Sequence, residues 1–301
     1  KIYVADSGNH LIRRIDIQNN AVTTWAGQAG RAGWQDGEQL KASFNFPQGL
    51  AIDNNGNLFV ADTHNNLIRK ISQGQVTTLL GNGRRGNTSD ELDLAENLST
   101  DFALALPAAL AYDDTLQLLF IADTFNQRIL ILKENREVNT LIKGFSPGSL
   151  QVYAKDSKKY LAYQNAQTGD LSTWDIIDQS TADLGKISDY PAISGGDQTA
   201  YLNFIYLNPG FLITQIDSQN QGKIISIKDQ NVTTLAQIDA LFRGKDYTFN
   251  AQSDYIGKVS LFKLKAIYPV VKDLLELRLA YQENSSHQLK SYYSLIVGNA
   301  D

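Results

Sequence analysis

The sequence predicts an all-β fold, a six-bladed β-propeller, on three observations. Short apolar runs rich in Val, Ile, Leu and aromatic residues are separated by Gly, Asn and Asp, which is the pattern of strands and turns. An Ala-Asp pair that ends such a run recurs at Asp6, Asp62 and Asp123, at spacings of 56 and 61 residues. Four runs fit into each interval, as expected for four-stranded antiparallel blades arranged around a channel.

The second repeat shows the blade pattern most clearly. We expect its strands at 49–53, 58–62, 67–72 and 76–81, joined by tight turns rich in Asn and Gly. Strands joined by turns this short form an antiparallel meander. Each repeat therefore predicts one twisted four-stranded sheet.

A polar corner follows each Ala-Asp pair. The carboxylate of Asp62 can accept hydrogen bonds from amides of the turn that follows, and Asn65 and Asn66 tolerate left-handed conformations. Arg69 opens the next strand, where it can pair with Asp62. We interpret the corner as a structural turn lock, with a functional role as the alternative. The equivalent residues in the other two repeats are Asp6, Asn9, Arg13, Asp123, Asn126 and Arg128.

The motif residues carry a family resemblance. The triplet 9-NHL-11, its variant 65-NNL-67, the segment 47-PQGLAIDNNGNLFVADTHNNLIRKI-71 and the lead-in 26-AGQAGRAGWQDG-37 resemble the NHL repeat, especially that of bacterial NHL repeat-containing proteins. The resemblance covers residues 1–143. It implies a propeller, and the bacterial type of connection suggests a binding module that is exported or attached to a surface.

The remaining sequence, 144–301, keeps the strand rhythm without the motif. We expect degenerate blades at 149–187 and 199–237, and a further one at 247–292, so the blade count beyond residue 240 is open between five and six. Residues 1–301 are interpreted as a single propeller domain.

The two ends of the sequence predict how the ring closes. The first repeat begins at the second strand of a blade, and 294-SLIVGNAD-301 followed by 1-KIYVAD-6 aligns with 49–62 without a gap. We expect residues 293–298 to supply the missing inner strand. The alternative is that 288–298 forms the outer strand of the last blade.

Two long connections, 28–47 and 82–106, are predicted to share one face with the polar turns, because successive strands alternate in direction. Trp and Arg are the residue types that anchor interfaces. The candidate binding residues are Arg31, Trp34, Asp36, Arg84, Arg85 and Phe125. The alternative is that Trp34 covers a sheet edge and that 89–98 forms a capped helical turn.

Composition narrows the function classes. A net charge of −5 disfavours nucleic acid as a partner, and no apolar run is long enough for membrane insertion. The lack of Cys removes zinc–thiolate sites and thiol nucleophiles. Two of the three His residues, His10 and His64, occupy equivalent turn positions, which favours a turn role over catalysis.

The sequence therefore predicts a non-enzymatic propeller that binds a protein or peptide through the face that carries the long connections. No catalytic residue is assigned, and a metal site is unknown. The alternative is a gluconolactonase-like hydrolase or lyase that holds Ca²⁺ or another divalent ion over the channel through Asp, Glu and Asn oxygens. We expect a monomeric propeller, periplasmic or secreted, that can form part of a larger chain.

Overall fold

The protein is described from a computed structural model that covers residues 1–16, 19, 21–87, 102–134, 136–166, 171–183, 200–207, 210–216, 222–228, 231–237, 245–250, 255–263, 275–283 and 289–293. Side chains are described up to residue 180 and at Phe204. Packing divides the chain into two compact units, 1–150 and most of 151–297, and each is described by itself.

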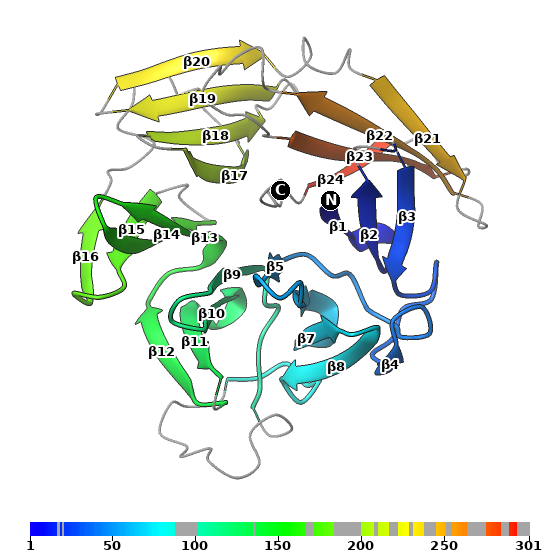
Figure 1. Ribbon diagram of the computed structural model, residues 1–301, viewed down its shortest axis with the longest axis horizontal. Helices are drawn as coiled ribbons and strands as arrows, with labels where there is room; N and C mark the ends of the chain where they lie inside the picture. The colour runs from blue at the N-terminus through cyan, green and yellow to red at the C-terminus, as the bar shows by residue number, and fades with distance from the viewer. Residues whose placement is uncertain are drawn as a thin grey trace. The chain divides into compact units, whose positions relative to one another are not determined.

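The described strands form six antiparallel sheets, three of which lie wholly within residues 1–150 (Figure 1). The first sheet contains β1 (Ile2–Asp6), β2 (Leu11–Asp16) and β3 (Ala21–Ala26). The second contains β4 (Gly37–Glu38), β5 (Leu50–Ile52), β6 (Leu58–Asp62), β7 (Leu67–Ser72) and β8 (Gln75–Leu80), in the order β4-β8-β7-β6-β5. The third contains β9 (Ala109–Asp113), β10 (Leu118–Asp123), β11 (Arg128–Lys133) and β12 (Val138–Lys143).

The other three sheets are four-stranded meanders in sequence order. The fourth contains β13 (Pro147–Lys155), β14 (Lys158–Asn165), β15 (Leu171–Asp175) and β16 (Ser180–Asp183). The fifth contains β17 (Ala200–Leu207), β18 (Gly210–Ile216), β19 (Gly222–Lys228) and β20 (Asn231–Gln237). The sixth contains β21 (Lys245–Asn250), β22 (Tyr255–Lys263), β23 (Leu275–Glu283) and β24 (Leu289–Tyr293). Strands are thus present in each of the three segments where the sequence predicts degenerate blades.

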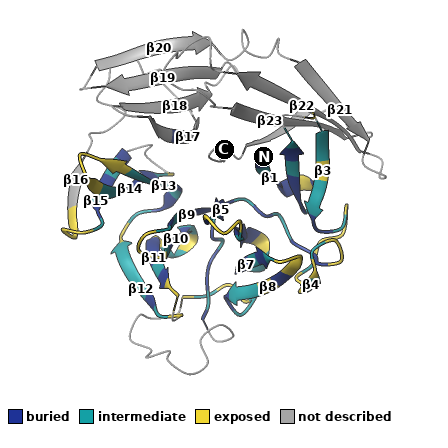
Figure 2. Cartoon of the chain, viewed as in Figure 1, coloured by how far each residue is buried: buried dark blue, intermediate teal, exposed yellow. Residues whose placement is uncertain are grey.

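A continuous apolar core joins the second and third sheets. Figure 2 shows the buried residues that run along both, and every residue of β6 is buried. The ring of Phe59 on β6 stacks on Tyr112 of β9 at a centroid distance of 5.0 Å. Gly49 sits so close to the third sheet that a Cβ there would lie 2.7 Å from Cα of Ala109. Small residues at this point let β5 lie beside β9 (Figure 1).

One backbone irregularity recurs in four sheets. The pairing register shifts by one residue in the last strand, which leaves an extra residue at Trp25, Leu79, Leu141 and Leu235. Each of these β-bulges follows Val-Thr-Thr or Val-Asn-Thr in the sequence. The bulge at Leu235 shows that the degenerate half of the sequence keeps the local geometry of the clear repeats.

The two ends of the chain are described only in part. The first sheet has three strands among the described residues, and β24 pairs with β23 through Tyr293. Tyr293 therefore belongs to the sixth sheet and does not begin a closing strand. Residues 294–301 lie outside the described residues, so closure of the ring by that segment stays a prediction.

Candidate functional site

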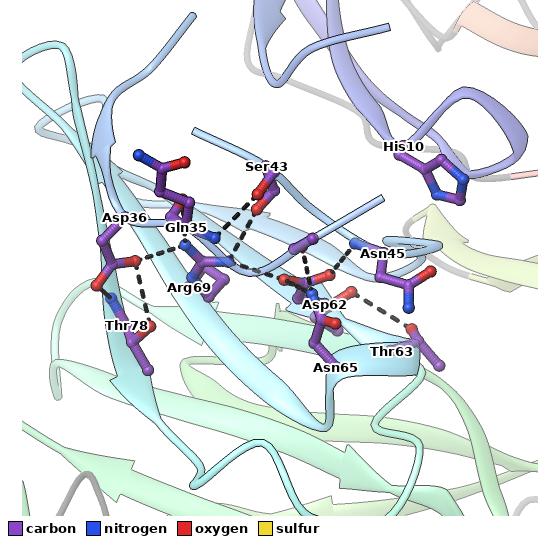
Figure 3. Close-up of polar contacts among 12 residues, drawn as sticks. His10, Gln35, Asp36, Ser43, Asn45, Asp62, Thr63, Asn65, Arg69 and Thr78 are labelled. Atoms are coloured by element: carbon purple, nitrogen blue, oxygen red, sulfur yellow. Dashed lines mark hydrogen bonds and ion pairs between the residues drawn. The ribbon is translucent and has the colours of Figure 1, made fainter. Parts of the chain in front are cut away.

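The polar corner of the second sheet is built around the buried carboxylate of Asp62, at the end of β6. Its Oδ2 accepts hydrogen bonds from Nη1 of Arg69 and from Nδ2 of Asn65, both at 2.8 Å (Figure 3). Its Oδ1 accepts a bond from the amide of Asn45 at 2.7 Å. A buried carboxylate needs this many donors to offset the loss of water.

The corner differs from its prediction in two respects. The turn η2 (Thr63–Asn65) is a 3₁₀ turn closed by its own backbone, and Asp62 makes no capping bond to it. The expectation that Asp62 binds amides of the following turn is therefore wrong: the amides of His64 and Asn66 donate to backbone carbonyls, and the amide that Asp62 accepts from is that of Asn45. The left-handed residue is Asn66, with φ of 53°, and Asn65 instead donates to Asp62 and to the carbonyl of Gly33.

The same corner recurs in the other two clear repeats, at η1 (Ser7–Asn9) and η3 (Thr124–Asn126). Nε of Arg13 lies 3.0 Å from Asp6, and Nε of Arg128 lies 2.8 Å from Asp123. Arg128 stands five residues after its Asp instead of seven, yet reaches the same carboxylate oxygen. The predicted Asp–Arg pairing is thus present in all three corners, also with Asn9 and Asn126 as donors.

Arg69 extends the corner into the first long connection. Its side chain is fully buried and donates to the carbonyls of Ser43 and Gln35 and to the carboxylate of Asp36 (Figure 3). Asp36 also accepts a bond from the amide of Thr78 on β8, at 2.9 Å. The structure thus places Asp36, a candidate ligand-binding residue, in the network that fastens this connection to the second sheet.

Burial sets the electrostatics of the corners. It raises the pKa of Asp62 to about 6, against the lowering effects of Arg69, the Asn45 amide and Asn65. It also raises the pKa values of Asp6 and Asp123, against similar partners. Desolvation therefore offsets much of the ion-pair attraction, and the corner contributes defined geometry more than net electrostatic stability.

A second set of contacts links each corner to the connection that leads into the next sheet. Nδ1 of His10 accepts a hydrogen bond from the amide of Phe46 at 3.1 Å, and Oδ1 of Asn66 accepts one from the amide of Leu106 at 3.0 Å. His10 and Asn66 occupy equivalent left-handed positions. A hydroxyl three residues before the left-handed position donates to the carbonyl of a proline at the entry to the next sheet, in the pairs Ser7–Pro47, Thr63–Pro107 and Thr124–Pro147.

The sequence analysis missed the roles of these hydroxyls and prolines, although their repetition was a usable signal. Pro47 and Pro107 stand shortly before the first strand of a sheet, Pro147 begins such a strand, and each hydroxyl directly follows an Ala-Asp pair. The long separations between partners, 40, 44 and 23 residues, are not periodic. The pairing of the two patterns is visible only in three dimensions.

Four candidate residues lie in or against the segment 83–85. The ring of Trp34 lies against Gly83, where a Cβ would be 2.0 Å from Cζ3 of the indole. Arg84 and Arg85 follow Gly83, and the guanidinium of Arg85 lies over the ring of Phe125 at 4.2 Å. We call Trp34, Arg84, Arg85 and Phe125 the ledge.

The ledge is open to solvent. Trp34 is 59% exposed and Phe125 is 58% exposed, and both arginines are exposed. The ring of Trp34 rests on the second long connection, at Gly83, and not on a sheet edge as in the alternative interpretation. Arg31 does not join the ledge through a described contact and donates to Gln28 at 3.0 Å. The predicted helical turn at 89–98 lies outside the described residues.

Two further findings concern metals and membranes. Among the residues whose positions are given, no group of three or more His, Asp or Glu side chains is placed to hold a metal ion. Within the same ranges, no helix has the length and apolarity that a membrane crossing requires.

Comparison with known proteins gives a family match and partial relatives. The NHL repeat family matches residues 44–71. Over 71 residues the chain is 51% identical to Protein SUPPRESSOR OF QUENCHING 1, chloroplastic, of Arabidopsis thaliana, which covers 24% of this chain and 7% of that protein. Over 88 residues it is 41% identical to NHL repeat-containing protein 2 of Gallus gallus, which covers 29% of this chain and 12% of that protein. The matches thus span a small part of these relatives.

Two solved structures resemble the chain over most of its length. One is the nidogen/laminin complex, with a TM-score of 0.54 at 12% identity, covering 97% of this chain and 92% of that chain. The other is streptogramin B lyase, with a TM-score of 0.51 at 10% identity, covering 98% of this chain and 80% of that chain. At such identities the likeness concerns the fold alone.

Replacing Asp62 by Ala is expected to lower the free energy of unfolding by about 1–3 kcal/mol, because it removes one of the two carboxylates that pair with Arg69 and leaves the amide of Asn45 without its acceptor. Urea unfolding of the wild type and the variant measures the change. The double variant D62A/R69M removes both charges and is expected to recover part of the loss. An unchanged unfolding midpoint in D62A would contradict the turn lock.

The His10 contact predicts a pH dependence of stability. Burial and the nearby His64 lower the pKa of His10, and its Nδ1 must be unprotonated to accept the amide bond of Phe46. The folded state then binds fewer protons than the unfolded state, so this stability is present above the unfolded pKa of about 6.5 and is lost as pH falls below it.

Substitution of His10 by Asn tests this directly, because Asn66 makes the equivalent bond through an oxygen that does not titrate. The free energy of unfolding of H10N is expected to fall less steeply than that of the wild type as pH drops below about 6.5. Because His64 contributes to the low pKa of His10, His64→Asn is expected to reduce this pH dependence in part, less than H10N does. A slope in H10N equal to that of the wild type would rule out this role of His10.

Proposed function

Because the chain belongs to the NHL repeat-containing proteins, we propose that its six sheets form a six-bladed β-propeller that binds a protein or peptide partner without catalysing a reaction. The meander order of the sheets supports the propeller. Further support comes from the repeated hydroxyl–proline contacts, which join each clear repeat to the start of the next sheet.

We propose that residues 294–298 close the ring by pairing with β1. The first sheet has β1 at one edge among the described residues, whereas β5 lies beside the equivalent strand β6 in the second sheet. The alignment of 294-SLIVGNAD-301 and 1-KIYVAD-6 with 49–62 assigns the missing strand to the end of the chain.

The observation that carries the binding function is the ledge. Two aromatic side chains, each more than half exposed, lie against a short segment that carries two exposed arginines, Trp34 at Gly83 and Phe125 at Arg85. Exposed Trp and Arg concentrate binding energy at protein interfaces, and clustered exposed apolar side chains mark interaction sites.

The double variant W34A/F125A is expected to weaken partner binding by tenfold or more, on the order of a hot-spot loss. The partner is first recovered on immobilised wild-type protein and identified by mass spectrometry, and affinities are then measured with the purified partner. Leu116→Ala removes a similarly exposed apolar side chain at the β9–β10 hairpin, at the opposite end of β10 from η3, and is the matched control. Equal affinities for all three proteins would overturn the proposed site.

Truncation after Tyr293 is expected to lower the free energy of unfolding by about 2 kcal/mol or more, through lost ladder hydrogen bonds and lost apolar burial. Truncation after Gly298 retains the predicted closing strand and is the control. Both variants are compared with the wild type by urea unfolding. If both behave like the wild type, the closing role of this segment is wrong.

A further inference from the structure

The charge of the ledge differs from that of the chain as a whole. The chain carries a net charge of −5, yet the ledge contains two exposed arginines, Arg84 and Arg85, that form no ion pair within the described residues. The acidic residues on the neighbouring connection are already engaged. Asp36 pairs with Arg69, and Glu38 pairs with Lys41 at 3.0 Å.

Three side chains of the ledge, Trp34, Arg85 and Phe125, have contacts that hold them in place before any partner arrives. The guanidinium of Arg85 lies over the ring of Phe125, which orients its plane while its N–H groups remain able to bind a carboxylate. Trp34 is positioned by its contact with Gly83, whose φ of +77° and missing Cβ are both needed there. Groups fixed in this way lose little conformational freedom on binding.

We propose that the partner of the ledge is an acidic peptide segment, an inference that rests on the proposed binding function. Carboxylates of Asp or Glu bind the guanidinium groups of Arg84 and Arg85, which match carboxylates in planar, paired hydrogen bonds. An apolar side chain of the same segment packs against Trp34 and Phe125. The positive charge of the ledge favours an acidic segment, and its exposed aromatic area favours an apolar side chain within that segment.

A nucleic acid offers the same kind of anion but fits the chain less well. The net charge of −5 repels a long polyanion, whereas a short acidic segment meets mainly the local field of two arginines. The described residues place two cations on the ledge, fewer than the series of phosphate contacts on which nucleic-acid affinity depends. Peptide and nucleic acid are separated by the experiment.

A random-peptide phage library selected on immobilised wild-type protein tests the proposal. Selected peptides are expected to be enriched in Asp and Glu, with an aromatic or aliphatic residue among them. A synthetic copy of a selected peptide is then titrated by fluorescence anisotropy at about 50 and about 500 mM salt, where weaker binding at high salt reports the charge contribution. A random RNA oligonucleotide pool is titrated in parallel.

The variant R84Q/R85Q is expected to weaken peptide binding about tenfold and to flatten its salt dependence. K133Q/R136Q removes two positive charges at the β11–β12 hairpin, at the far end of β11 from η3, and is expected to retain wild-type affinity. Unfolding midpoints of both variants confirm that they are folded.

The outcomes separate the two proposals. Peptides without acidic enrichment that still depend on Trp34 and Phe125 overturn the acidic partner and leave the binding function intact. Peptides whose affinity is the same for W34A/F125A and R84Q/R85Q as for the wild type, or a selection without enrichment, overturn both. Tight RNA binding that R84Q/R85Q abolishes, with no peptide enrichment, replaces the peptide by a nucleic acid.

Discussion

The buried Asp–Arg pair at the end of the second strand is the constraint from which each clear repeat is organised. A carboxylate without water requires donors from several directions, and the chain supplies a guanidinium, an Asn amide and, at Asp62 and Asp123, a backbone amide from the preceding connection. Satisfying one charge therefore fixes three segments at once. Desolvation offsets much of the attraction between the two charges. The main effect of the ion pair is therefore to fix the relative positions of these segments.

Contacts with these corners determine the paths of the long connections. Arg69 holds Asp36 and the carbonyls near it, so the first long connection runs along the second sheet and adds β4 to its edge. Its close approach also brings Trp34 against Gly83. The buried network thus determines where the exposed ledge lies. The side chains of the ledge take no part in the hydrogen bonds of the corner and are exposed to solvent.

The strands and the short-range ion pairs were predictable from the sequence because they depend on neighbouring residues. Contacts between residues far apart in the sequence were not. Strand alternation located the sheets even in the degenerate half, and a short turn made the pairing of Asp62 with Arg69 foreseeable. The bond from Asn45 to Asp62 and the contact of Trp34 with Gly83 depend on the route of a long connection, which no periodic pattern encodes. Asp36 was predicted to bind a ligand because the sequence does not reveal its partner, Arg69, which lies 33 residues away.

The repeated bulge has a consequence for how molecules of this protein meet one another. Each bulge interrupts the hydrogen-bond ladder near the end of the last strand of its sheet, at Trp25, Leu79, Leu141 and Leu235. A regular outer strand is a template on which a strand from a second molecule can add, and a bulge twists that template out of register. In the second sheet β4 also covers part of the outer strand. The motif that shapes the sheets therefore also guards a repetitive, strand-rich chain against open-ended growth into fibres.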